Sequence, residues 1–145
     1  MADFFDVVSE WIEETEVKID DILQTIIIQV GTMVVRLSPV DTGRFRANWH
    51  LSIDAESGTS STAFDQEGQS TINLIASEAN RFTAGQVAYI QNNVLYGHDL
   101  EWGLYNGPTQ KVTAEGFSTQ APNGMVRVTE AEFMNIVNEA IRLHQ

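Results

Sequence analysis

Residues 22–49 read ILQTIIIQVGTMVVRLSPVDTGRFRANW and contain the transition on which the fold depends. From Ile22 to Leu37, apolar residues recur at steps of three and four, a spacing that predicts a helix. The β-branched runs in this stretch would also suit a strand. The helix is favoured because the apolar stripe continues without a turn signal. Ser38-Pro39 should end it, since a proline forces the residue before it out of the helical conformation.

The same apolar stripe extends upstream almost to the N-terminus, which predicts one long helix with an acidic extension over residues 1–21. Its members are Phe4, Val8, Trp11, Thr15, Ile19, Ile22, Ile26, Val30, Met33 and Leu37. From Ile26 onward the helix is apolar nearly all round, so we expect burial on several sides, by its own domain or by a neighbouring subunit. Ile26, Ile27, Val30 and Val34 are therefore candidate interface residues.

Asp41-Thr42-Gly43 is the active-site tripeptide of aspartic proteases, and it admits two interpretations. In a turn, Pro39 fixes φ, Gly43 permits a positive φ, and Asp41 hydrogen-bonds the backbone or pairs with Arg44 or Arg46. In a protease, two such carboxylates from two copies of the chain would share a proton. Two arginines so close would keep Asp41 ionised, which favours the turn. A homodimeric protease using Asp41 remains the alternative.

The residues after this tripeptide predict an α+β fold with a small antiparallel sheet. From Phe45 to Asp54, apolar and polar residues alternate, as in a strand with one buried face. Residues 55–70 are rich in Ser, Thr and Gly and predict a loop. We expect a helix around Ile72–Ala79, a second strand at residues 86–93, and a short helix at residues 96–103 that ends at Gly103.

The last part of the chain predicts an irregular stretch followed by a helix. Residues 104–119 have no periodicity and form an inserted loop or hairpin, with a turn expected at Glu115-Gly116. Thr129 and Glu132 match a helix-capping box. The buried face of the final helix should then carry Phe133, Ile136, Val137, Ala140 and Ile141. We expect all 145 residues to form a single domain.

Composition limits the possible chemistry. The formal net charge is −12, and the chain has no cysteine. No basic run is present to neutralise phosphates, so sequence-specific binding of nucleic acid is not expected. His98 and Glu101 have the spacing of two zinc ligands on a helix, but no third ligand is evident. We therefore expect no metal, no cofactor and no enzymatic activity. The apolar stretches are too interrupted to predict a membrane span, and the acidic start does not resemble a secretory leader.

An aromatic cluster in the third quarter of the chain is either core or interface. It comprises Tyr96, Leu100, Trp102 and Tyr105. Tyrosine and tryptophan are favoured at the centres of subunit interfaces. We therefore take Tyr96, Leu100, Glu101 and Trp102 as further candidate interface residues.

Three stretches, in order, resemble the tail-completion or head–tail joining (neck) proteins of long-tailed bacteriophages, of the minor tail protein Z type. They are SPVDTGRFRANW at 38–49, VAYIQNNVLYGHDLEWG at 87–103 and QAPNGMVRVTEAEFMNIVNEAI at 120–141. With its connecting segments, the resemblance covers roughly residues 22–143. The acidic extension and the insertion at 104–119 depart from the family pattern.

The resemblance implies a non-enzymatic virion protein, assembled in the host cytoplasm and located at the neck. It implies a homo-oligomer, a ring of six copies between the head connector and the tail tube, with DNA at most passing through its channel. On this interpretation the tripeptide at Asp41 is a helix-to-strand turn. A soluble adaptor that forms no ring is a further alternative.

Overall fold

The computed structural model describes residues 3–145, and its backbone is dominated by one helix. Helix α1 spans Phe4–Leu37, 34 residues, which corresponds to a length of about 50 Å. Asp3 and Asp6 form a reciprocal capping box at its start. The long helix expected from the apolar stripe is confirmed, and so is its end before Ser38-Pro39.

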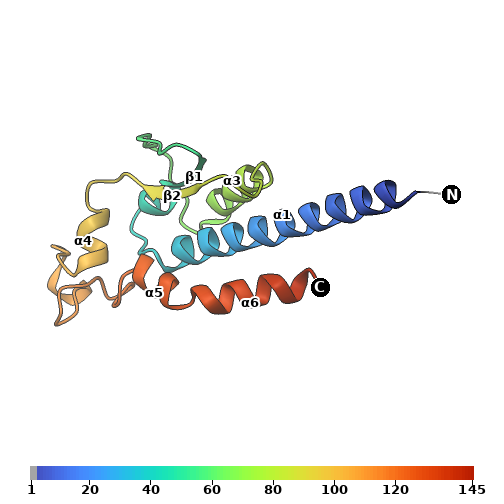
Figure 1. Ribbon diagram of the computed structural model, residues 1–145. Helices are drawn as coiled ribbons and strands as arrows, with labels where there is room; N and C mark the ends of the chain where they lie inside the picture. The colour runs from blue at the N-terminus through green and yellow to red at the C-terminus, as the bar shows by residue number, and fades with distance from the viewer. Residues whose placement is uncertain (1–2) are drawn as a thin grey trace.

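The other elements gather along the second half of α1 and beyond its C-terminal end, where α4 lies (Figure 1). They are α2 (Arg44–Ala47), β1 (Trp49–Ile53), α3 (Gln69–Ala79), β2 (Ala88–Asn92), α4 (Gly97–Trp102), the 3-10 turn η1 (Thr109–Lys111), α5 (Val126–Ala131) and α6 (Phe133–Leu143). The two strands form an antiparallel pair in which Leu51 lies opposite Ile90. The mixed α+β class with a small antiparallel sheet is confirmed.

The core lies between α1 and two flanking layers. Helix α3 and the sheet pack on one side of α1, while α5 and α6 run along another side (Figure 1). Ile27, Val34 and Val35 of α1 are buried against this surrounding shell. Gly31 allows α3 to approach closely, because a Cβ at Gly31 would lie 2.7 Å from Cγ2 of Ile75. Gly31 therefore marks the point of closest approach between α1 and the Ile75 side chain of α3.

The first half of α1 projects beyond the rest of the molecule (Figure 1). Within the described chain, Asp20 is the first α1 residue to hydrogen-bond another element, accepting from the backbone N–H of Ala84. His144, next to the C-terminus, hydrogen-bonds Thr25 at 2.7 Å. The body therefore begins near residue 20, and the preceding turns of α1 lie outside it. No helix in the part of the chain that the structure describes is long and apolar enough to cross a membrane.

Two predictions from the sequence are wrong in detail. The strand begins at Trp49 rather than at Phe45, because residues Arg44–Ala47 form the helical turn α2. The Thr129/Glu132 capping box does not exist. The Thr129 hydroxyl donates to the carbonyl of Met125 inside α5, so the helix starts three residues before the predicted cap.

The buried face of the C-terminal helix is also narrower than predicted. Ile136 and Ala140 are buried, whereas Phe133 and Ile141 remain largely exposed. The reason is that α6 packs mainly against α1, so the side of α6 that faces α1 is the best covered. Elsewhere the predictions for α3, β2 and α4 agree with the structure, including the end of α4 at Gly103, which has φ +75°.

Candidate functional site

The turn after α1 is held by buried polar contacts. Ser38 ends the helix, and its hydroxyl donates to the carbonyl of Val34 at 2.6 Å while accepting from the Trp49 indole N–H at 2.7 Å. Gly43 has φ +92°, as the turn prediction required. A Cβ at Gly43 would lie 2.6 Å from the backbone nitrogen of Gln66, so no side chain fits there.

Arg46 joins three segments near this turn through backbone carbonyls. Its guanidinium donates to the carbonyl oxygens of Arg36 and Ser38, both at 3.0 Å, and of Gln66 at 2.9 Å. Burial lowers the pKa of Arg46, an effect that the nearby Asp65 carboxylate partly opposes. Arg46 therefore binds the end of α1 to the loop before α3.

Asp41 does not have the role predicted for it. It is exposed, and its carboxylate forms no hydrogen bond or ion pair with any residue of the described chain. Arg46 is directed at carbonyl groups instead. Asp65 takes the capping role for α3, accepting from the backbone N–H groups of Gly68 and Thr71 at 3.0 and 2.8 Å.

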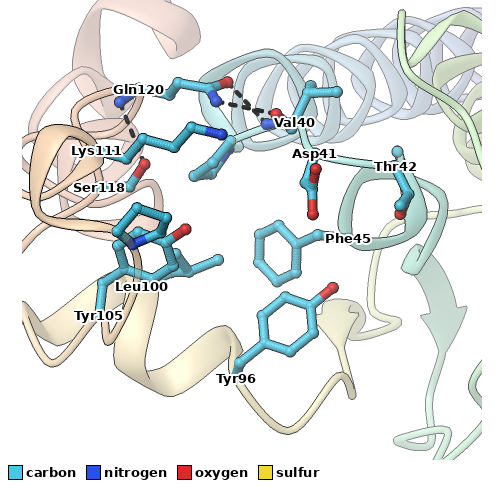
Figure 2. A pocket seen from close by; sticks show the side chains of 13 residues that line it. Val40, Asp41, Thr42, Phe45, Tyr96, Leu100, Tyr105, Lys111, Ser118 and Gln120 are labelled. Atoms are coloured by element: carbon cyan, nitrogen blue, oxygen red, sulfur yellow. Dashed lines mark hydrogen bonds between the residues drawn. The ribbon is translucent and has the colours of Figure 1, made fainter.

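A cleft of about 330 Å³ opens beside Asp41, between the turn and the segment that follows α4 (Figure 2). We call it the D-T-G cleft. Its apolar wall is formed by Phe45, Tyr96, Leu100 and Tyr105, and Lys111 lies on its far side. The Gln120 side chain closes one end, exchanging hydrogen bonds of 2.8 and 2.9 Å with the backbone of Val40.

The polar groups of the D-T-G cleft do not form an acid–base pair. Asp41 is the only carboxylate among the residues that line it, so any catalytic dyad would require a second copy of the chain. Burial raises the pKa of the Tyr96 hydroxyl; Arg44 opposes this shift and Asp41 adds to it. A neutral phenol and aromatic walls suit an apolar or aromatic side chain.

Glu101 connects α4 to the start of α5. The sequence predicted instead that it is an interface residue or a zinc ligand. It is only 7% exposed, and its carboxylate caps the start of α5. It accepts from the backbone N–H groups of Met125, Val126 and Arg127 at 2.6, 3.0 and 2.9 Å. Gly124 has no room for a side chain, because a Cβ there would lie 2.8 Å from the Glu101 carboxylate.

Arg127 completes this contact from the other side. Its guanidinium donates to the Glu101 carboxylate at 3.3 Å and to the Glu101 carbonyl at 2.6 Å, and lies 4.6 Å from the centre of the Trp102 ring. Burial raises the pKa of Glu101, but the hydrogen bonds from the three N–H groups and the guanidinium outweigh it. The pKa of Glu101 therefore lies below its ordinary value.

The candidate interface residues divide into three groups by their exposure. Ile27, Val34, Leu100 and Glu101 are buried inside the chain's own fold, which leaves little of their surface for another subunit. Ile26 and Val30 are half-buried. Tyr96 and Trp102 remain exposed, at 42% and 54%. The prediction overestimated how much of the apolar helix would be left for a partner, because α3, α5 and α6 cover most of it.

The metal-site hypothesis finds no support in the arrangement of these residues. Glu101 faces the start of α5, while His98 is exposed next to Asp99. Between residues 3 and 145, no three metal-ligating side chains of His, Cys, Asp or Glu come together.

The insertion at residues 104–119 forms one wall of the D-T-G cleft. It folds back as a short hairpin, with Val112 paired to Ser118 and Gly116 in the turn at φ +91°. The backbone N–H of Tyr105 donates to the carbonyl of Gly116 at 3.0 Å, which ties the hairpin to the end of α4.

No protein-family model, curated protein or solved structure matches this chain.

Proposed function

We propose that this protein is a structural subunit of the neck of a long-tailed bacteriophage, six copies of which form a ring at the head–tail junction. The observation that carries the proposal is the projecting half of α1. Phe4, Phe5 and Trp11 are 76%, 77% and 64% exposed there, beyond the reach of the chain's own core. Large apolar side chains grouped on an exposed surface are typical of subunit contacts.

The three stretches that resemble the neck family have structural roles, which fits a protein without catalytic activity. The first contains the turn at which α1 ends. The second supplies Glu101 and the third supplies Arg127, and these two residues bind each other across 26 positions of the sequence. The three stretches therefore build one scaffold, and the D-T-G cleft lies within it.

The charge of the chain fits a channel through which DNA passes without binding. With a net charge of −12, the chain as a whole would repel a phosphate backbone. A ring with this surface keeps duplex DNA mobile. Mixing the protein with duplex DNA at low salt should leave the migration of the DNA in a native gel unchanged.

The mass of the protein in solution tests the ring directly. Light scattering after size exclusion, at several protein concentrations, should reveal a species of six times the 16.1 kDa chain mass. Electron microscopy of that species should show closed rings. A chain that stays monomeric at every concentration would favour the adaptor without a ring, and a discrete dimer would direct attention back to a protease using Asp41.

A further inference from the structure

We infer that the first turns of α1 dock into the D-T-G cleft of a second copy of this chain. Phe4 and Phe5 would occupy the aromatic wall, and the acidic tip of the helix would face Lys111 and Arg44. This inference rests on the proposed ring and names the contact that builds it.

The donor surface is the N-terminal end of α1. Phe4 and Phe5 lie next to each other at its tip, with ring centroids 6.2 Å apart, and both are about three-quarters exposed. The end of the helix is strongly negative as well. Residues 3–21 contain eight acidic residues and one lysine, a net charge of −7. Its partner should therefore combine an apolar hollow with positive charge.

The D-T-G cleft has both features. Phe45, Tyr96 and Tyr105 provide flat apolar walls, and its volume of about 330 Å³ suits an aromatic side chain. Lys111 lines the cleft, and Arg44 lies close enough to shift the pKa of Tyr96. Neither Lys111 nor Arg44 has an ion-pair partner within the described residues. Arg36, also unpaired there, lies at the same end of α1.

Charge distinguishes this cleft from the most apolar of the other hollows that the described residues form. A groove of about 380 Å³ lies between α1, the sheet and α5–α6, with Val30, Phe133 and Met134 in its walls. Its only charged lining residue is Glu130, which would repel the acidic tip. The D-T-G cleft contains the Asp41 carboxylate, but Lys111 offsets that charge and Arg44 lies close by, so the acidic tip meets less repulsion there than at the Glu130 groove.

The donor and the cleft cannot meet within one chain. They lie at opposite ends of one continuous helix, about 50 Å apart. Two acidic tips would also repel each other, each bringing a charge of −7. The contact is therefore head to tail between copies, and a head-to-tail contact repeated with the right rotation closes into a ring.

Chemical crosslinking tests this contact, since the natural chain contains no cysteine. A Val7→Cys variant, which keeps both phenylalanines and is substituted at a 54% exposed position one turn further along α1, is mixed with a Thr42→Cys variant and treated with a short bismaleimide. We expect a covalent dimer containing one chain of each kind, and little dimer from either variant alone. Leu74→Cys, at a 73% exposed position on α3, replaces Thr42→Cys as the matched control and should give almost none.

A second variant measures the strength of the contact. Phe4→Ser should weaken assembly by about 30-fold or more, because a buried aromatic anchor contributes at least that much to an interface. Leu74→Ser removes an equally exposed apolar side chain far from the contact and should leave the assembly constant unchanged.

The results separate this contact from the ring. A six-chain species without crosslinks between positions 7 and 42, or with crosslinks between two copies of position 7 instead, overturns the contact and leaves the ring. Specific crosslinks between positions 7 and 42 in open chains overturn the ring and leave the contact. A chain that neither assembles nor crosslinks overturns both.

Discussion

Glu101 and Arg127 bind each other through both backbone and side chain. The Glu101 carboxylate accepts the backbone N–H of Arg127 at 2.9 Å, and the Arg127 guanidinium returns a hydrogen bond to the Glu101 carbonyl at 2.6 Å. The carboxylate also accepts from Met125 and Val126, so one side chain of α4 satisfies the first turn of α5. Helix starts are usually capped by a neighbour in sequence, whereas this cap holds two distant segments together.

Replacing Glu101 by alanine should lower the free energy of unfolding by about 2–4 kcal/mol. The substitution removes the acceptor of three backbone N–H groups and one of the two acceptors of the Arg127 guanidinium, and an N–H group that is shielded from water and left unsatisfied is costly. Urea unfolding followed by circular dichroism measures the change. Glu130→Ala, at an exposed position on α5, is the control and should change stability by no more than about 0.5 kcal/mol. An equally small change in the free energy of unfolding for Glu101→Ala would mean that the Glu101 cap does not stabilise the fold.

Acid should remove the contribution of the Glu101 carboxylate. Its pKa is lower in the folded protein than the ordinary value of 4.5. The carboxylate therefore stabilises the fold fully above the unfolded pKa, and this stabilisation is lost as the pH falls through the folded pKa. The stability gap between the native chain and Glu101→Gln, measured by urea unfolding, should shrink as the pH falls from about 7 to about 3. A gap that does not change with pH would contradict this role.

The sequence predicts elements with strong local signals and misses those set by distant contacts. The stripe of α1 and the glycine after α4 identify those helices correctly. Phe45 and Ala47 alternate as in a strand, but they lie in a helical turn that follows Gly43 and is tied by Arg46 to the carbonyls of distant segments. Nothing in the local pattern indicates those carbonyls.

The same limit explains the residues of the candidate site. The sequence marks Glu101 as a possible zinc ligand and as a candidate interface residue, but its acceptor role depends on a turn 24 residues away. Asp41 has a familiar tripeptide and two nearby arginines, yet Arg44 carries no ion pair and Arg46 faces the backbone. A short motif gives the spacing of side chains along the chain but not their direction in the fold.

Gly31→Ala should destabilise the protein by about 1–2 kcal/mol, although alanine is the better helix former by about 1 kcal/mol. The added methyl group would lie 2.7 Å from Cγ2 of Ile75, a stiff β-branched side chain that is 2% exposed. In an Ile75→Ala background the same change should be neutral or stabilising. Gly58→Ala, with no atom within 4 Å of its Cβ, is the control, and thermal unfolding of the four variants provides the comparison.

Asp41 and Asp65 should respond differently to the same substitution. Asp65→Ala removes the acceptor for two N–H groups at the start of α3 and should cost about 0.5–2 kcal/mol. Asp41→Ala removes an exposed carboxylate without a hydrogen bond and should change stability by less than about 0.5 kcal/mol. Pepstatin-sensitive cleavage of an unfolded substrate, abolished by Asp41→Asn, would instead support the protease interpretation.

The projecting half of α1 should be the least protected helical segment of the isolated chain. A lone helix of this length is marginally stable in water, and its acidic residues at i, i+3 and i+4 spacing, such as Glu10, Glu13 and Glu14, repel one another. Hydrogen exchange followed by mass spectrometry should therefore show fast exchange at residues 4–19 and slow exchange at residues 27–35 in the monomer.

Assembly should reduce this difference in exchange rate between residues 4–19 and residues 27–35. If the tip of α1 docks into a neighbour, residues 4–19 gain burial and bring their acidic side chains next to Lys111 and Arg44, so their exchange should slow at protein concentrations where larger species form. Raising the salt concentration should partly restore fast exchange at residues 4–19, because salt screens the attraction between their acidic side chains and Lys111 and Arg44. Protection that is the same in the monomer and in the assembly would mean that the projecting helix stands alone, and that the copies meet elsewhere.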